Sequence, residues 1–241
     1  MKQILLTLLF LLANVHASEN IKLMTEIFPP YQFKNEKNEL VGVTVEIVEA
    51  IQNELGTKYK IVVYPWSRAL KFTKKKKNHA VFSMLRTPER ENNYKWVGPI
   101  EKLEMVFFKR KGSQLDIHSL EDAKKVAKIG VPKNVANHKM LLKEGFTNLD
   151  VSASGGDDIV MKKLIRGRVD LVPTLRSAAL YNLKKQGDAG KAVPIDSFKI
   201  FEGDFYIAFN KKTDNAIIKR WQQAFDKLLK NGTIEKIKKR Y

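Results

Sequence analysis

The chain alternates short apolar stretches with amphipathic helical segments, and it does so twice, which constrains its fold more than any other feature. In the first run we expect strands at residues 21–25, 59–64 and 80–85, and helices at 43–55 and 67–77, the second capped by Ser67. In the second run we expect strands at 126–131, 149–152 and 169–173, and helices at 135–144 and 157–165. This alternation predicts an α/β fold with mostly parallel sheets flanked by helices.

Two more apolar extended stretches, 103–109 and 206–210, separate the runs from each other and from expected helices at 215–230 and 233–240. If one folding unit is inserted into another, the chain crosses into the inserted unit once and returns once. We therefore expect two lobes joined by two hinge strands, lobe 1 at residues 18–102 plus 205–241 and lobe 2 at 103–204. Ligands of open α/β sheets bind beyond the carboxyl ends of the strands, so two facing sheets predict one cleft.

The first residues resemble an export signal. Lys2 precedes an apolar run at residues 4–12 that is too short to span a bilayer, and small residues at Val15 and Ala17 suit cleavage before Ser18. We expect residues 1–17 to be a signal peptide and the mature protein to be periplasmic. The chain has no cysteine, which excludes disulfides and thiolate metal sites, and its four histidines show no metal spacing. We expect no metal.

The net charge is strongly positive. Lys and Arg number 44 against 26 Asp and Glu, which gives a formal charge of +18. In a cytosolic protein such a charge would suggest nucleic acid, but export argues against that partner. We expect the run at residues 74–77 to be a solvated helix end. Two further roles of a lysine-rich surface stay open, steering of anionic ligands and docking on an acidic partner.

Several weak motifs occur in one order along the chain: Pro29-Pro30-Tyr31, then residues 42–46, 87–90, 96–99, 164–170 and 231–237. In this order they resemble the extracellular solute-binding proteins of family 3, which serve polar amino acid ABC transporters. The resemblance implies a monomeric, two-lobed receptor that closes on a small-molecule ligand and delivers it to a membrane permease. It implies no cofactor and no catalytic residues.

The resemblance also implies a carboxylate grip at Arg90, which ends the Thr-Pro-Glu-Arg motif at residues 87–90. A guanidinium offers a planar fork of donors that matches a carboxylate. The competing interpretation of Arg90 is a surface ion pair with Glu89 or Glu91. By family position, Phe28 and Tyr31 face the ligand, although either residue is also compatible with a core role.

Departures from the family pattern affect the ligand more than the fold. Leu175 stands where amino acid binders carry an aspartate for the ligand's ammonium group, and Leu85 stands where a small hydroxyl residue is usual. Arg86 adds a cation beside the motif. Asn134 keeps a helix cap in lobe 2 but loses the usual hydroxyls. These changes favour a carboxylate-bearing ligand with more negative charge or less ammonium.

Other cleft candidates follow strand ends. Arg68 and Arg86 are expected to converge with Arg90, and Trp66 to stack on a flat ligand, unless Trp66 packs in lobe 1 and Arg68 is solvated. Glu26 suits either a ligand amine or an arginine, and Glu46 is expected to be structural. The complete set of expected ligand contacts is Glu26, Phe28, Tyr31, Trp66, Arg68, Ser83, Arg86, Arg90, Asn134, Thr174 and Arg176.

Two alternatives to a transport receptor share this fold. One is an enzyme similar to cyclohexadienyl dehydratases, with Glu26 as the acid or base. Nearby arginines would favour the charged carboxylate and oppose the raised pKa that a general acid needs. The other is a receptor that presents its closed form to a membrane signalling protein.

Overall fold

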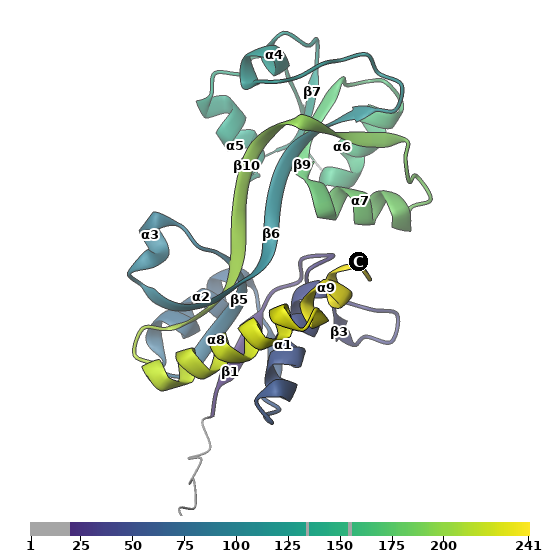
Figure 1. Ribbon diagram of the computed structural model, residues 1–241. Helices are drawn as coiled ribbons and strands as arrows, with labels where there is room; N and C mark the ends of the chain where they lie inside the picture. Colours follow the sequence, from purple (N-terminus) through teal and green to yellow (C-terminus); the bar gives the residue numbers. More distant parts are fainter. Residues whose placement is uncertain (1–19, 134, 154–155) are drawn as a thin grey trace, which may run out of the picture.

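The computed structural model describes residues 20–133, 135–153 and 156–241. The predicted signal peptide and Asn134 lie outside these residues. The chain forms two lobes connected by a pair of long strands, one drawn in teal and one in green (Figure 1). In the described part of the chain, no helix has both the length and the apolar character needed to cross a bilayer.

Lobe 1 contains parallel strands covered by helices. Its strands are β1 (Lys22–Thr25), β4 (Ile61–Val63) and β5 (His79–Leu85), with a small hairpin formed by β2 (Phe33–Lys34) and β3 (Leu40–Val41). Its helices are α1 (Val43–Glu54), α2 (Trp66–Lys75), α3 (Pro88–Glu91), α8 (Asn215–Lys230) and α9 (Thr233–Lys238). The first and last parts of the chain therefore build one lobe together.

Lobe 2 repeats the same arrangement. Its parallel strands are β7 (Ile129–Pro132), β8 (Leu149–Ser152) and β9 (Leu171–Leu175). Its helices are α4 (Leu120–Lys124), α5 (Ala136–Lys143), α6 (Gly156–Ile165) and α7 (Arg176–Lys185). The repeated alternation predicted from the sequence is confirmed.

The two connecting strands are longer than the apolar stretches that predicted them. They are β6 (Tyr94–Arg110) and β10 (Ala192–Asn210), which pair antiparallel with each other. Because β10 also pairs with β5 and β6 also pairs with β9, both lobes share one eight-stranded sheet, in the order β4-β1-β5-β10-β6-β9-β7-β8. The expected lobe boundaries at residues 102/103 and 204/205 fall inside these strands and stay a prediction.

Two local expectations were wrong. Helix α2 begins at Trp66 and its N-cap is Pro65, so Ser67 lies inside the helix and does not cap it. The proline ring fixes φ near −65°, and the observed −53° suits the turn that enters the helix. Strand β7 begins at Ile129, three residues after the predicted start at Val126.

The core of lobe 1 is completed by residues from the end of the chain. Trp221 and Phe225 of α8 are buried against Phe209 of β10 and the apolar face of α1. The rings of Phe209 and Trp221 lie edge to face, with centroids 5.3 Å apart, a preferred aromatic geometry. Lobe 1 therefore depends on β10 and α8, which follow lobe 2 in the sequence.

Candidate functional site

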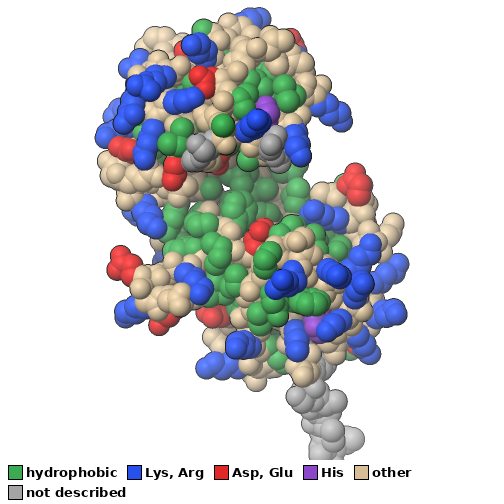
Figure 2. Space-filling model, turned by 180° about the vertical axis from the view of Figure 1, so that it is seen from behind, with side chains coloured by type: hydrophobic (Ala, Val, Ile, Leu, Met, Phe, Trp, Pro, Cys, Tyr) green, Lys and Arg blue, Asp and Glu red, His purple; other side chains and the backbone are tan. Residues whose placement is uncertain are grey.

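The carboxyl ends of the parallel strands in both lobes face the gap between them. Glu26 and Phe28 follow β1, Leu85 ends β5, and Leu175 ends β9. The space-filling view shows a hollow between the lobes that is lined mainly by hydrophobic side chains, while lysines and arginines cover the outer surface (Figure 2). This hollow is the candidate ligand cleft.

Arg90 follows the carboxyl end of β5. It belongs to the single turn of α3, which Pro88 begins and Thr87 precedes in an extended conformation. Its Nη1 donates a hydrogen bond of 3.0 Å to the backbone oxygen of Leu85, which ends β5. Among the described residues, no carboxylate forms an ion pair with Arg90. The guanidinium thus keeps donors for an external anion.

Arg86 is already paired. Its Nε and Nη2 donate to the two carboxylate oxygens of Glu91 at 2.7 and 2.6 Å. Its guanidinium also lies over the rings of Trp96 and Tyr206, at 5.6 and 5.1 Å from their centroids. The hydrogen bonds to Glu91 raise the pKa of Arg86. The competing interpretation of Arg90, an ion pair with Glu91, is therefore not supported, because Glu91 binds Arg86.

The two remaining predicted arginines, Arg176 and Arg68, have different surroundings. Arg176, the first residue of α7, donates to Glu104 at 2.9 Å and to Asp196 at 2.6 Å. Arg68 is exposed, and its guanidinium lies 6.0 Å from the ring of Tyr64. The predicted convergence of Arg68 and Arg86 with Arg90 stays a prediction. Ligand contact by Arg68, Arg86 or Arg176 stays a prediction.

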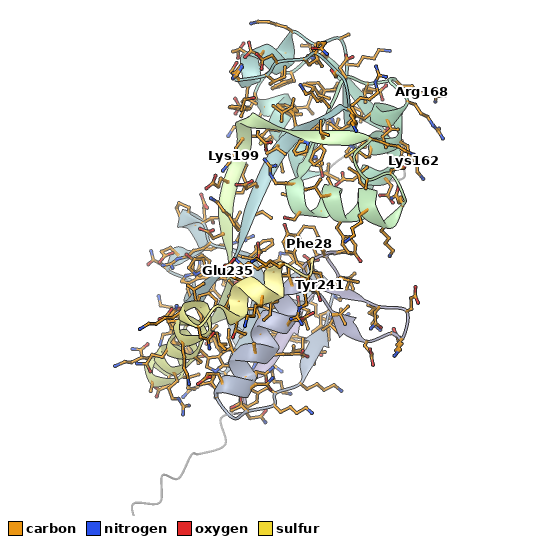
Figure 3. All side chains as sticks on the ribbon, turned by 45° about the vertical axis from the view of Figure 1, so that its right-hand side comes forward. Phe28, Lys162, Arg168, Lys199, Glu235 and Tyr241 are labelled. Atoms are coloured by element: carbon orange, nitrogen blue, oxygen red, sulfur yellow. The ribbon has the colours of Figure 1, made fainter. Side chains whose placement is uncertain are left out.

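The aromatic candidates near β1, Phe28 and Tyr31, form an aromatic cluster with Phe205 of β10. The centroid of Tyr31 lies 5.2 Å from that of Phe28 and 5.1 Å from that of Phe205. Tyr31 is 1% exposed, and burial raises the pKa of its hydroxyl to about 12, although a hydrogen bond with Ser177 of lobe 2 lowers it. Phe28 is half-buried and projects from lobe 1 toward lobe 2 (Figure 3). Tyr31 is therefore a core residue that also links the lobes.

Ser83 lies in a buried polar cluster that contacts the backbone of Tyr31 through Thr44. Its hydroxyl is 2.8 Å from Gln32 Oε1 and 2.9 Å from Thr44 Oγ1, and Thr44 Oγ1 donates to the backbone oxygen of Tyr31. The φ angle of Ser83 is 60°, in the left-handed region that non-glycine residues rarely adopt. The cluster supports the position of Tyr31 in the cleft wall.

Thr174 and Trp66 are also engaged within their own lobes. Thr174 is 3% exposed, and its Oγ1 donates to Asp157 at 3.1 Å. Burial raises the pKa of Asp157. Trp66 is half-buried against a cluster that includes Met24 and Met84, as its alternative interpretation predicted. Only its place at a helix start marks Asp157 in the sequence.

An apolar surface connects the candidate residues of the two lobes. Leu85 of β5, Phe201 of β10 and Leu175 at the end of β9 are half-buried and pack against the lobe 1 core, as Phe28 does. We call Phe28, Leu85, Leu175, Phe201 and Phe205 the apolar wall. In the sequence, Leu85 and Leu175 stand out only as departures from the family pattern. Phe201 and Phe205 were not predicted, and they alternate with acidic residues on a strand that crosses between the lobes.

The acidic candidates differ in their partners. Glu26 is half-buried, no cation pairs with it in the described part of the chain, and burial raises the pKa of its carboxyl. Glu46, at the first turn of α1, pairs with Arg240 and accepts a hydrogen bond from the Tyr241 hydroxyl. Glu46 therefore fastens the end of the chain to lobe 1, and Glu26 remains a candidate for ligand contact.

Comparison with known proteins identifies several relatives. The L-cystine-binding protein TcyJ of Escherichia coli is 24% identical over 215 residues, which span 89% of this chain and 79% of that protein. The histidine-binding periplasmic protein of Escherichia coli is 24% identical over 262 residues, spanning 100% of this chain and 97% of that protein. The arginine-binding periplasmic protein of Mannheimia haemolytica is 25% identical over 98% of this chain and 97% of its own length. All three are named as binding proteins and none as an enzyme.

Solved structures share the two-lobed fold. An ancestral arginine-binding protein bound to arginine superposes with a TM-score of 0.68 at 26% identity, covering 94% of this chain and 99% of that one. The second substrate-binding domain of Lactococcus lactis GlnP, in its open conformation, has a TM-score of 0.73 at 18% identity, over 91% and 94% of the two chains. The sequence profile of the bacterial extracellular solute-binding proteins, family 3, matches residues 21–241. The chain therefore belongs to family 3 of the bacterial extracellular solute-binding proteins.

Proposed function

We propose that this protein captures a small carboxylate-bearing ligand in the periplasm, by closure of its two lobes, and delivers it to an ABC permease. The ligand is amino acid-like or another organic anion. The observation that carries the proposal is Arg90, whose guanidinium binds the backbone oxygen at the carboxyl end of β5 and has no acidic partner in the described chain. The names of the relatives, which bind cystine, histidine or arginine, support a ligand with a carboxylate.

Hinge closure follows from the topology. A ligand that is contacted by both lobes binds the closed state more tightly than the open one and shifts the population toward it. The two lobes are joined through β6 and β10, while Tyr31 and Ser177 already connect them on one side of the cleft. Closure would bring the start of α7 toward Arg90.

The test is a comparison of two arginine variants. Ligand retained on natively purified protein is identified by mass spectrometry and titrated calorimetrically into wild type, Arg90→Ala and Arg168→Ala. Arg168 is the matched control, because it is exposed on lobe 2 far from the cleft (Figure 3). Charge-assisted hydrogen bonds contribute about 1.5–3 kcal/mol each, so loss of two should weaken binding by about 100-fold or more. Equal affinity of wild type and Arg90→Ala would sink the proposal.

A binding role also predicts that no product forms. Incubation with prephenate or arogenate should leave both compounds unchanged, as followed by chromatography. Conversion that disappears in Glu26→Gln would instead support an enzyme that uses Glu26. Whether the closed form serves a permease or a signalling protein is tested by reconstituting transport in vesicles that contain polar amino acid ABC permeases.

A further inference from the structure

The apolar wall is one continuous face of the shared sheet. Strand pairing places Leu175 opposite Met105, and Met105 opposite Phe201, across β9, β6 and β10. In the same way Phe205 of β10 lies opposite Leu85 of β5. Directly paired residues of neighbouring strands share a face, so these side chains form rows that run from lobe 1 to lobe 2.

Charged side chains occupy the opposite face of the same strands. Phe201, Gly203 and Phe205 alternate with Glu202 and Asp204 along β10, and alternate residues of a strand point to opposite faces. Glu202 binds Lys102 and Lys199, both at 2.6 Å. These ion pairs therefore lie away from the wall.

One acid does share the wall's face. Glu101 is paired in register with Phe205, but its side chain is 15% exposed and its carboxylate forms an ion pair with Lys238 at 3.4 Å. It is therefore already neutralised by a cation of the protein. Among the described residues of this face, no further carboxylate stands beside Leu85 or Leu175.

Gly203 lets the wall close over the strand. A Cβ at this position would stand 2.6 Å from Leu85 Cδ1 and 2.9 Å from Phe201 Cζ. The two side chains thus lie above the glycine, and hydrocarbon covers a place where backbone would otherwise face the cleft. A ligand lying there meets an apolar surface.

The cation at the end of the wall fixes how a ligand would lie. Arg90 Nη1 donates to the backbone oxygen of Leu85, so the guanidinium adjoins the first residue of the wall. An anion held by Arg90 places its body against Leu85 and Phe201. Across the cleft, β9 ends at Leu175 and α7 starts at Arg176, and neither side chain can accept a hydrogen bond from an ammonium group.

We infer that the cleft takes a carboxylate with an aliphatic or aromatic body, and that the ligand needs no ammonium group. The inference rests on the proposed function and narrows its ligand class. Burial of apolar surface contributes roughly 25 cal/mol per Å², which favours hydrocarbon on the wall. A polar or charged ligand side chain in the same place would lose its water without gaining a partner.

The first test compares ligands in calorimetric titrations of the natively purified, ligand-free protein. Hydrocinnamate and isocaproate are the desamino forms of L-phenylalanine and L-leucine. Both should bind at least as tightly as these amino acids and about 10-fold or more tighter than L-arginine, L-histidine or L-glutamate. Tightest binding of a polar amino acid, or loss of binding on removal of the amino group, would overturn the inference.

The second test changes the wall. Leu175→Asp should weaken binding of isocaproate about 10-fold or more, because a carboxylate replaces hydrocarbon and repels the anion. Leu229→Asp is the matched control, since Leu229 is 46% exposed on α8, which belongs to lobe 1. Leu85→Ser supplies a neutral second variant, and melting curves confirm that each variant folds. Unchanged affinity in both folded wall variants contradicts the inference.

A third variant tests whether Glu26 binds an ammonium group of the ligand. If Glu26 held a ligand ammonium, Glu26→Gln would weaken binding; without an ammonium group, the same change removes a negative charge near the carboxylate and tightens binding of isocaproate. Failure of this inference is distinct from failure of the proposed function. A polar amino acid that binds through Arg90 defeats the inference alone, whereas affinity that does not depend on Arg90 defeats the function.

Discussion

Arg176, at the start of α7, donates a hydrogen bond of 2.9 Å from its Nε to Glu104 on the hinge strand β6. Glu104 also binds Lys199 of β10 at 2.7 Å, and Arg176 binds Asp196 at 2.6 Å (Figure 3 labels Lys199). A single carboxylate therefore connects both hinge strands to the helix that borders the cleft from lobe 2.

Neutralising this carboxylate should loosen the hinge. Glu104→Gln removes the negative charge that binds Arg176 and Lys199. We expect the free energy of unfolding to fall by about 1 kcal/mol, and the melting temperature by about 2–4 °C. The control is Glu121→Gln, whose exposed pair with Lys124 spans one helical turn and should contribute less than about 0.5 kcal/mol. Equal melting temperatures for the two variants would contradict the assigned role of Glu104.

Low pH should destabilise the same region because Glu202 becomes protonated. Hydrogen bonds from Lys102 and Lys199 lower the pKa of Glu202 from 4.5 to about 2. Because the folded-state pKa is depressed, its stabilisation is present above pH 4.5 and is lost as the pH falls toward about 2. Melting curves across this range should decline less steeply for Glu202→Gln than for wild type, and parallel declines would refute the pairing.

High pH should destabilise the folded protein through ionisation of Tyr31. Burial raises the pKa of Tyr31 from 10.0 to about 12. The raised pKa means that the stabilisation is complete below pH 10.0 and is lost as the pH rises toward about 12. In urea unfolding, Tyr31→Phe should therefore lose less stability over this interval than wild type does. A steeper loss in the variant would show that another group dominates.

The end of the chain should contribute measurably to lobe 1. The Tyr241 hydroxyl accepts a hydrogen bond of 3.1 Å from the backbone nitrogen of Gly42 and donates one to Glu46. Tyr241→Phe removes both, and we expect a loss of about 1–2 kcal/mol in urea unfolding. Tyr64→Phe is the control, because its hydroxyl has no hydrogen bond within the described residues; a loss as large there would argue against the contact.

Periodicity predicted the scaffold well because it depends on local sequence. Helix α8 was predicted with its observed bounds at Asn215–Lys230, and β8 at Leu149–Ser152. Helix α7 was missed, although its buried Ala179 and Leu183 belong to the lobe 2 core. These two residues are too few to mark an apolar face in a segment of ten residues.

The site was less predictable because it depends on partners far apart in the chain. Arg86 and Arg90 look equivalent in the sequence, but Glu91 of α3 pairs with Arg86, while Arg90 binds the backbone oxygen of Leu85. Phe201 joins the apolar wall through its pairing with Met105, a register that no local pattern reveals. Residue type thus indicated a carboxylate grip, whereas three-dimensional pairing decided which arginine is free.

The late position of Trp221 and Phe225 affects how the protein is made. Translation completes lobe 2 before the chain reaches these two residues, which fill the lobe 1 core. Domains usually fold in the order of synthesis, the amino-terminal one first. In this chain all residues of the inserted lobe 2 are available before lobe 1 is complete. The first segment, with β1 and α1, therefore cannot finish folding until the last helices are available.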